Sequence, residues 1–328
     1  MLIRQAVTDE ANQAVDAATV LVRLREGRPK PRRTGMLVAV AGFAVAAAVV
    51  AVVVPLTASR EAAPVPPASA PNQPVPVTEQ NILLVGLDEA NYTDTIILVR
   101  HSADGSFRAL SIPRDTYVDI PGQGQHKINS AYARGAANGM KTLVATVQEL
   151  TGVTVNHYAA VKMADFAKLA DAVGGVEVCL KTATKDAYSN ANLPAGKQTL
   201  TGDSLLAFLR QRHGLPNGDL DRVVRAQVFL RALVNKVAGS KNLPALVEAV
   251  KNTVQVDPAW NVVEFANQVA TGATAVSGTI PYADAAKQTP DDGDVIAVDP
   301  AKVKDFTGKF LSDGSGKGPG TQDPTCVW

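Results

Sequence analysis

The stretch NILLVGLDEANYTDTIILVR, residues 81–100, decides the fold. It holds two short apolar runs, 81–87 and 95–100, whose branched side chains are typical of strands buried on both faces. A short polar loop joins them, with Asp88 just past the end of the first run and Asp94 just before the second. We therefore expect two adjacent strands whose connecting turn brings both carboxylates together.

Two carboxylates that converge at such a turn suit a hard divalent cation, which prefers oxygen ligands. Asp88 and Asp94 are therefore candidate metal ligands. Aspartate is also common in ordinary turns, where its side chain bonds to the local backbone. The residues alone leave both interpretations open.

Apolar runs continue to alternate with amphipathic segments along the rest of the chain. This alternation predicts an α/β or α+β sandwich around one central sheet. We expect an α-β-α arrangement, in which a central mixed β-sheet is flanked by helices. Further strands are expected at 108–112, 157–161, 176–180 and 294–298, and helices at 141–150, 164–173, 203–210, 221–237, 243–253, 259–270 and 300–311.

One transmembrane helix is expected to precede this domain. Residues 36–57 are uncharged and almost entirely apolar, and about 20 helical residues cross a hydrocarbon core of about 30 Å. Basic residues cluster at 23–33, so the positive-inside rule places 1–35 in the cytoplasm and everything after the helix outside. A cleaved signal peptide and a buried core helix are the alternatives, and the long leader and long apolar run disfavour the first.

Residues 58–80 contain six prolines, which favours an extended polyproline-type spacer that holds a domain off the membrane. A proline-rich ligand for a partner module is the alternative. The remaining residues, 81–328, are expected to form one extracytoplasmic domain, near the upper size limit for a single core.

The composition narrows the classes of function. The chain has 328 residues, of which 46% are hydrophobic and 19% charged, and its net charge is +1. A disordered or collagen-like protein is thereby excluded, and the near-neutral charge argues against a general nucleic-acid binder. The two cysteines are too few for a disulfide-dense scaffold, and no CxxC spacing indicates structural zinc.

The segment SIPRDTYVDIPG, residues 111–122, places Arg114 at the carboxyl end of an expected strand, where open α/β sheets bind ligands. Arginine binds phosphate through two parallel hydrogen bonds, and a neighbouring acid such as Asp115 can hold the guanidinium in place. A local surface pair between Arg114 and Asp115 is the alternative.

The segment LRQRHGLPNGDLDRVVRAQ, residues 209–227, concentrates basic charge. Arg222 and Arg225 are three residues apart on an expected helix and share a face, and the intervening loop can fold Arg210 and Arg212 back toward it. Four arginines without matching acids on one patch indicate a polyanionic ligand or a nucleic-acid stripe. Outside a membrane, a phosphorylated ligand is the better interpretation, with Asp219 or Asp221 capping the helix.

The segments NILLVGLD, TDTIILV, SIPRDTYVDIPG, HKINSAY, LTGVTVNHY, DAVGGVEV and LRQRH…GDLDRVVRAQ follow one another after an N-terminal anchor. In this combination the chain resembles the LytR-CpsA-Psr family over residues 80–239. The resemblance implies a membrane-anchored transferase that takes a glycopolymer from a polyprenyl-pyrophosphate carrier and joins it to peptidoglycan through a phosphodiester. It also implies Mg²⁺ as the cofactor, with Mn²⁺ as the alternative. Membrane lipid is an implied partner, and nucleic acid is not.

Roles for single residues follow from the same resemblance, with two departures from the family pattern. Tyr92 stands where the family often has an arginine implicated in catalysis, and Ala226 replaces one residue of the usual RQQ. Tyr92 bears on the rate of transfer more than on pyrophosphate binding. The implied metal ligands are Asp88 and Asp94, the implied catalytic residues are Asp88, Asp94, Arg114 and Arg212, and the implied pyrophosphate-binding residues are Arg114, Lys127, Arg210, Arg212, Arg222, Arg225 and Gln227.

The residues leave the proton acceptor and the reaction class open. An acid such as Asp94 or Asp219 can take the proton of an attacking sugar hydroxyl, and the sequence does not choose between them. A phosphohydrolase that releases its product to water is one alternative function. A non-catalytic binding or regulatory module is another, since Tyr92 can mark a degenerate site.

Cys179 and Cys326 are expected to form a disulfide. The expected topology places both outside the membrane, where disulfides persist. Cys179 lies near the end of an expected strand, whereas Cys326 follows a glycine-rich tail that would fray unless it were tied down. A buried free thiol at Cys179 and a disordered tail are the alternative.

Overall fold

The computed structural model describes residues 78–239, 253–261, 265, 275–316 and 326–328, which belong to one compact unit. The expected cytoplasmic tail, transmembrane helix and nearly all of the linker lie outside these residues, as do most of the helices expected at 243–253 and 259–270. Within the described part of the chain, no helix combines the length and apolar character needed to cross a membrane.

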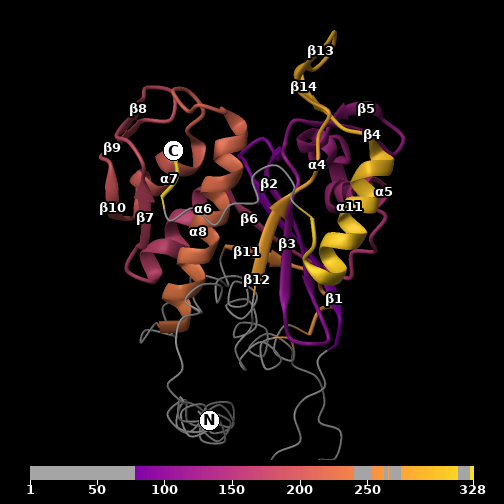
Figure 1. The fold of residues 1–328 in the computed structure, drawn as a ribbon, viewed down its shortest axis with the longest axis horizontal. Coiled ribbons are helices and arrows are strands. Elements are labelled where there is room, and N and C mark those ends of the chain that lie inside the picture. The colour runs from indigo at the N-terminus through magenta and orange to yellow at the C-terminus, as the bar shows by residue number, and fades with distance from the viewer. Residues whose placement is uncertain (1–77, 240–252, 262–264, 266–274, 317–325) are drawn as a thin grey trace, which may run out of the picture. The chain divides into compact units, whose positions relative to one another are not determined.

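A six-stranded mixed sheet lies at the centre of the fold (Figure 1), in the order β11-β6-β1-β2-β3-β12. β2 pairs antiparallel with both β1 and β3, whereas β6 is parallel to β1 and β12 is parallel to β3. The predicted mixed central sheet is confirmed. Its strands are β1 (Gln80–Leu87), β2 (Thr93–His101), β3 (Phe107–Ser111), β6 (His157–Lys162), β11 (Val254–Val256) and β12 (Ala275–Thr279).

The central strands are apolar on both faces because each face contributes to a separate hydrophobic core. Along β1, Ile82 belongs to one core and Leu83 to the other; along β2, Ile97 and Leu98 alternate in the same way. Side chains alternate between faces along a strand, so a continuous apolar run is the pattern that a sheet covered on both sides requires.

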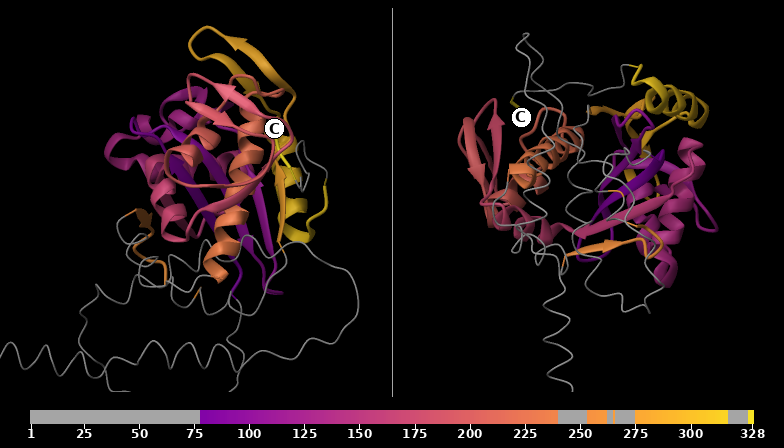
Figure 2. Two further views of the ribbon diagram at one scale, coloured as in Figure 1. Left: turned by 90° about the vertical axis from the view of Figure 1, so that its left-hand side faces the viewer. Right: turned by 90° about the horizontal axis from the view of Figure 1, so that it is seen from below.

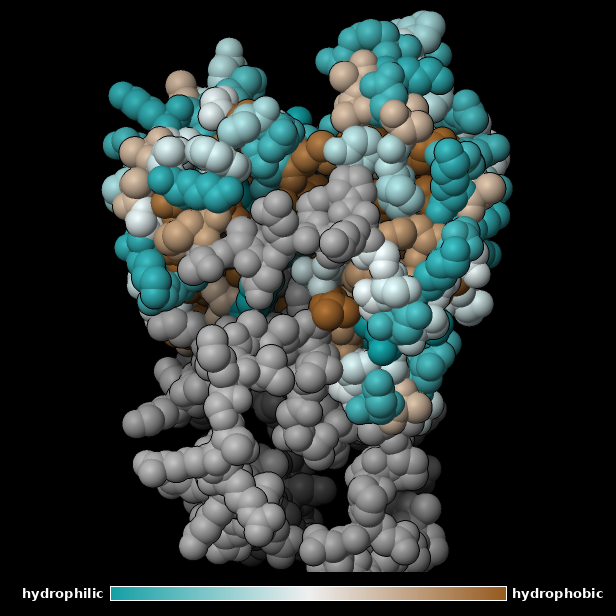
Figure 3. All heavy atoms as spheres, viewed as in Figure 1, coloured by the Kyte–Doolittle hydropathy of each residue, from teal (hydrophilic) through white to brown (hydrophobic). Residues whose placement is uncertain are grey.

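Helices cover both faces of this sheet, which gives the expected three-layer arrangement (Figures 1 and 2). α5 (Gly139–Thr151) and α11 (Pro300–Asp313) pack on one face, and α6 (Met163–Ala172), α7 (Gly202–Arg210) and α8 (Asp219–Gly239) contribute to the core on the other. α11 begins where Asp299 accepts hydrogen bonds from the backbone N–H groups of Ala301 and Lys302, which satisfies donors that a helix start leaves unpaired. Hydrophilic side chains cover much of the described surface in the view of Figure 3.

Two of the expected strands do not join the central sheet, so the prediction of one sheet was incomplete. β7 (Val176–Leu180) pairs with β10 (Gly196–Leu200), and β14 (Gly293–Ala297) lies in a four-stranded sheet ordered β13-β14-β4-β5. Apolar periodicity identifies a strand but not its partner, which depends on the chain path. The remaining elements are β4 (Thr116–Ile120), β5 (Gly124–Lys127), β8 (Thr184–Asp186), β9 (Ala191–Leu193), β13 (Asp284–Thr289), α4 (Ala131–Arg134) and the 3₁₀ turns Ile128–Ser130 and Ala136–Asn138.

The last described residues are attached to β7. Cys326 forms a disulfide with Cys179, which pairs the two cysteines as expected. Next to it, the Val327 N–H donates to the Cys179 carbonyl and the Lys181 N–H donates to the Val327 carbonyl, both at 2.8 Å. Residues 326–328 therefore extend the β7 side of the molecule through covalent and backbone bonds together.

Candidate functional site

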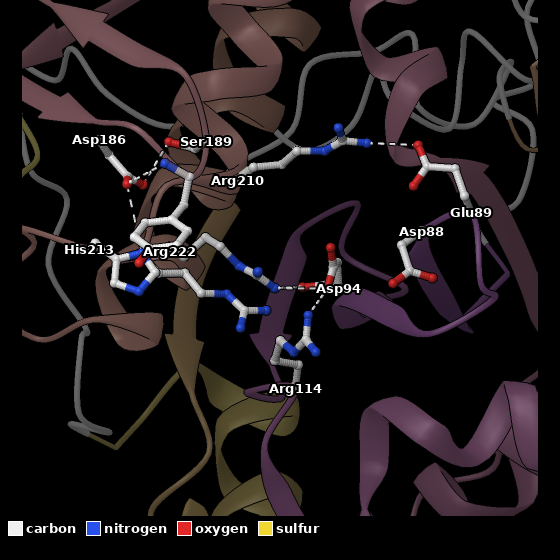
Figure 4. Close-up of a pocket in the computed structure, with 11 residues that line it drawn as sticks. Asp88, Glu89, Asp94, Arg114, Asp186, Ser189, Arg210, His213 and Arg222 are labelled. Atoms are coloured by element: carbon white, nitrogen blue, oxygen red, sulfur yellow. Dashed lines mark hydrogen bonds and ion pairs between the residues drawn. The ribbon is translucent and has the colours of Figure 1, made fainter.

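A pocket of about 370 Å³ opens where several chain segments end near one another. The β1–β2 turn, the start of β2, the loop after β3, the β8–β9 turn, the α7–α8 loop and the first turn of α8 each contribute to it. Figure 4 shows side chains from these segments directed toward one another. Its lining residues are Asp88, Glu89, Asp94, Arg114, Asp186, Tyr188, Ser189, Arg210, Arg212, His213 and Arg222.

Asp94 forms the centre of an ion-pair cluster. Its Oδ1 atom accepts a hydrogen bond from Arg114 Nη1 and lies 3.2 Å from Arg222 Nη2, which also donates to the Asp94 carbonyl at 3.0 Å. All three side chains are largely buried. Asp94 is the second residue of β2 rather than a loop residue before it, and the antiparallel pairing with β3 places Arg114 at the same end of the sheet.

Asp88 is held by its own turn instead. Its Oδ1 atom accepts the backbone N–H groups of Ala90 at 2.9 Å and Tyr92 at 2.7 Å, and Asn91 takes a left-handed φ of 65°. Asp88 is therefore an ordinary turn aspartate that bonds to its local backbone, and it also lines the pocket, as a metal ligand must. Tyr92 is 39% exposed and contributes its backbone N–H to fixing Asp88.

Every arginine of the pocket faces a carboxylate, so the expectation of arginines without matching acids was wrong. Arg212 Nε lies 3.2 Å and Arg222 Nε 3.6 Å from Asp219 Oδ1. Arg210 Nη2 donates to Glu89 Oε1 at 2.9 Å. Glu89 comes from the β1–β2 turn, more than 100 residues before Arg210, and the folded chain alone brings the two together.

Like charges nevertheless crowd around Arg212. Its pKa is lowered from the ordinary arginine value, first because burial disfavours the charged form and then because Arg222 and Arg114 add positive charge nearby. The carboxylates of Asp219 and Asp94 oppose this shift without cancelling it. A bound anion would relieve the repulsion, so the cluster suits a phosphorylated ligand.

Three of the predicted site residues do not line the pocket. Lys127 lies behind Arg114, because its Nζ is 3.3 Å from Asp115 Oδ1 and Asp115 is in turn 3.7 Å from Arg114 Nε. Gln227 is buried and donates to Ser111 Oγ at 2.6 Å. The third residue is Arg225.

Arg225 is completely buried, one helical turn beyond Arg222 on α8. Its Nη1 donates to the Phe208 carbonyl at 3.0 Å and to Gln211 Oε1 at 2.9 Å, and its Nε donates to the main-chain oxygen of Trp328. The guanidinium carbon stands 4.7 Å from the Phe208 ring centre. Burial lowers the pKa of Arg225 to about 10. The shared helix face was correctly predicted, but a rise of about 4.5 Å along the helix separates these arginines into a pocket and a core.

The sequence-based prediction missed five lining residues: Glu89, Asp186, Tyr188, Ser189 and His213. Three of them lie in or beside the β8–β9 turn, within KDAYSNA, which has no feature that distinguishes it from an ordinary polar turn. His213 is the exception, since it directly follows the two arginines at 210 and 212.

The donor set fits a single magnesium ion. No group of three or more His, Cys, Asp or Glu residues suited to a metal occurs in the described part of the chain. Magnesium usually keeps several waters and is bound by one or two carboxylates together with substrate phosphates. Asp88 and Asp94 both line the pocket, and in the described structure the Oδ2 atom of each lacks a hydrogen-bond partner. These two oxygens are suitable ligands.

A three-layer fold around a mixed sheet, with arginines and carboxylates gathered at one pocket, defines a protein suited to a phosphorylated ligand. The family follows from comparison: the chain belongs to the LytR_cpsA_psr family, whose model matches residues 57–296. The resemblance found in the sequence motifs is thereby confirmed.

Individual relatives agree with this assignment. The chain is 39% identical over 272 residues to the cell wall biosynthesis protein LcpA of Corynebacterium glutamicum, a match that covers 72% of this chain and 52% of LcpA. It is 36% identical over 186 residues to the polyisoprenyl-teichoic acid–peptidoglycan teichoic acid transferase TagU of Bacillus cereus, covering 54% of this chain and 60% of TagU. The chain thus spans about half the length of LcpA.

The fold is also similar to solved structures. A crystal structure of a protein from Enterococcus faecalis, described as the transcriptional regulator EF0465, superposes with a TM-score of 0.60 at 29% identity. This match covers 73% of the present chain and 88% of that protein. The likeness supports the three-layer architecture described above.

Proposed function

We propose that this protein is a membrane-anchored transferase that moves a glycopolymer from a polyprenyl-pyrophosphate carrier to peptidoglycan, leaving a phosphodiester linkage. The observation that carries the proposal is the pairing of Arg114 and Arg222 with Asp94 in a pocket that Arg212 also lines. Similarity to TagU, a polyisoprenyl-teichoic acid–peptidoglycan teichoic acid transferase, supports the reaction class, and similarity to the cell wall biosynthesis protein LcpA supports a place in that process.

The charge pattern of the pocket suits a metal ion and a pyrophosphate bound together. Four arginines and four carboxylates line the pocket, so the formal charges of its lining balance. A divalent cation and a doubly esterified pyrophosphate carry opposite charges of equal size and preserve this balance. Asp88 and Asp94 would hold the cation, and the guanidinium groups would bind the phosphate oxygens through paired hydrogen bonds in one plane.

In the proposed reaction, a sugar hydroxyl of the acceptor attacks the phosphorus attached to the glycopolymer. A new oxygen–phosphorus bond forms, the bridging pyrophosphate bond breaks, and polyprenyl phosphate leaves with the electron pair. Arg114, Arg212 and Arg222 stabilise the negative charge that develops on the phosphate oxygens, because they are held in place before the reaction. Magnesium, when bound, would neutralise part of the same charge.

The attacking hydroxyl must give up its proton, and the sequence offers Asp94 and Asp219 as candidate bases. Asp94 lines the pocket. Asp219 lies outside the pocket lining, and its two side-chain oxygens are buried near Arg212 and Arg222. Of these two acids, Asp94 is therefore the one that can meet a bound acceptor, and its Oδ2 atom would serve either the metal or the proton.

The membrane placement is part of the proposal and rests on the sequence. Residues 36–57 form the anchor, 1–35 lie in the cytoplasm, and the domain from 81 onward faces outward. The Cys179–Cys326 disulfide supports this topology, because such bonds persist outside the cytoplasm.

Magnesium titration tests the metal ligands without requiring turnover. Asp88→Ala and Asp94→Asn should each abolish binding measured by isothermal titration, and asparagine keeps a hydrogen-bond acceptor for the two arginines. Asp104→Ala is the matched control, because Asp104 is an exposed carboxylate that accepts a backbone N–H in the β2–β3 turn outside the pocket lining. Unchanged binding in both pocket variants would refute the assignment.

Product analysis tests the reaction class. The full chain is incubated with a labelled polyprenyl-pyrophosphate sugar and a short glycan acceptor, and a phosphodiester-linked adduct is expected. Free sugar phosphate as the only product would indicate a phosphohydrolase instead. The absence of any product with magnesium bound would indicate a binding or regulatory module.

A further inference from the structure

The β8–β9 turn places an aromatic ring at the pocket. Tyr188 lines the pocket together with the arginines and is nevertheless 84% exposed, far more than the other exposed large apolar side chains described. A tyrosine in this state presents a broad apolar face to water, which is unfavourable unless a ligand covers it. The ring is therefore accessible to a ligand that enters the pocket.

The turn that carries Tyr188 is held in a defined conformation. Asp186 is buried, and its Oδ1 accepts the Tyr188 N–H at 3.0 Å while its Oδ2 accepts the Ser189 hydroxyl at 2.8 Å. Asn190 completes the turn with a left-handed φ of 59°, a conformation that asparagine tolerates better than most residues. The position of the ring is thus set before any ligand arrives.

The same turn is docked on the loop that carries the pocket arginines. His213 packs against the Tyr188 ring, with ring centres 4.3 Å apart, and its Nδ1 lies 3.7 Å from Asp186 Oδ1. Gln211, between Arg210 and Arg212, donates a hydrogen bond to the Thr184 hydroxyl on β8. These contacts fix the distance between the Tyr188 ring and the pocket arginines.

The chemistry around the Tyr188 ring matches a sugar. A pyranose ring presents C–H groups on one face, which pack flat on an aromatic ring, and hydroxyl groups along its edge, which need polar partners. Ser189 and His213, which line the pocket beside Tyr188, supply such partners, whereas buried Asp186 holds the turn. A polyprenyl chain would instead need a continuous apolar wall, and this side of the pocket is largely polar.

We propose that Tyr188 is the platform of a carbohydrate subsite that holds a pyranose ring next to the reacting phosphate. This inference rests on the proposed transferase function and deepens it. The sugar belongs either to the acceptor glycan or to the glycopolymer on the carrier, and both present the same chemistry to the ring.

Steady-state kinetics with the full chain, a polyprenyl-pyrophosphate-linked disaccharide and a soluble peptidoglycan glycan fragment tests the subsite. Tyr188→Ala should raise KM for one of the two substrates about tenfold, the size expected for one lost stacking contact. Tyr188→Leu keeps bulk but not the flat face and should behave in the same way, whereas Tyr188→Phe should stay within about twofold of the original protein. The substrate whose KM rises identifies the source of the sugar.

Val276→Ala is the matched control, because Val276 is an exposed apolar residue on β12 outside the pocket lining, and it should leave both KM values unchanged. Unchanged KM values for both substrates in Tyr188→Ala would overturn the proposal. If the original protein forms no adduct, the transferase function fails, and titration with chitotriose followed by NMR then decides the subsite by itself. Binding that is lost in Tyr188→Ala supports the platform, and equal binding in both proteins refutes it.

Discussion

Arg222 and Arg225 lie three residues apart on α8 and have opposite surroundings. Arg222 reaches Asp94 at the pocket, where its fork faces a carboxylate and the space for a ligand. Arg225 reaches away from the pocket into the core, where it holds the carbonyl of Phe208 and the main-chain oxygen of Trp328. The comparison shows that a run of arginines is not one structural unit: the same charge lines the pocket at one turn of the helix and holds tertiary structure at the next.

The Cys179–Cys326 disulfide anchors the segment that Arg225 contacts, and breaking this bond should give the largest effect. The bond joins residues 147 positions apart, so Cys326→Ser should lower the free energy of unfolding by about 4–5 kcal/mol in the chain-entropy model. Urea unfolding of the oxidised protein and the variant measures the difference. An unchanged transition midpoint would show that the bond contributes nothing to stability.

Arg225→Met should have the next largest effect, a loss of about 3 kcal/mol in unfolding free energy, because it leaves buried acceptors without a donor. Activity well below the unfolding transition should remain within about threefold of the original, since Arg225 does not touch the pocket.

Combining Arg225→Met with Cys326→Ser tests whether the two single changes destabilise the same part of the structure. Because Arg225 binds Trp328, two residues beyond the disulfide, the two losses should be less than additive. Full additivity would mean that Arg225 does not depend on the anchored segment.

Arg222→Lys tests the pocket side of the comparison. Lysine keeps the charge but loses the planar fork that contacts Asp94, so turnover should fall about 100-fold. The unfolding free energy should fall by less than in Arg225→Met, because lysine keeps a positive charge beside Asp94 and Asp219. A variant that loses stability but keeps its rate would place Arg222 with Arg225 as a structural residue.

Arg210→Lys should have the smallest effect. Arg210 stands at the rim, where its side chain is 37% exposed and its partner Glu89 is 73% exposed, and exposed ion pairs contribute little. We expect KM for the carrier substrate to rise about threefold, with stronger dependence on salt than in Arg222→Lys. A loss as large as that of Arg222→Lys would place Arg210 in direct contact with the phosphates.

The predictable part of the site lies at strand ends. Asp88, Asp94 and Arg114 follow or begin apolar runs, and adjacent strands necessarily bring such ends together. Tyr188 was not predictable in this way, because its turn belongs to a separate two-stranded sheet whose position depends on contacts with the α7–α8 loop. The burial of Arg225 was also not predictable, because helical spacing gives the direction of a side chain but not what packs against it.

The sequence by itself determined the elements and the chemical content: apolar runs that form strands covered on both faces, an arginine-rich segment, two turn carboxylates and two cysteines. These are local properties, set by side-chain type and by periodicity along a few residues. Only the tertiary structure decided that Arg222 meets Asp94 across 128 residues and that Arg225 meets Trp328 across 103. Charge and hydropathy belong to each residue, whereas burial and contact partners arise from the whole folded chain. Burial and contact partners place Arg222 at the pocket and Arg225 in the core.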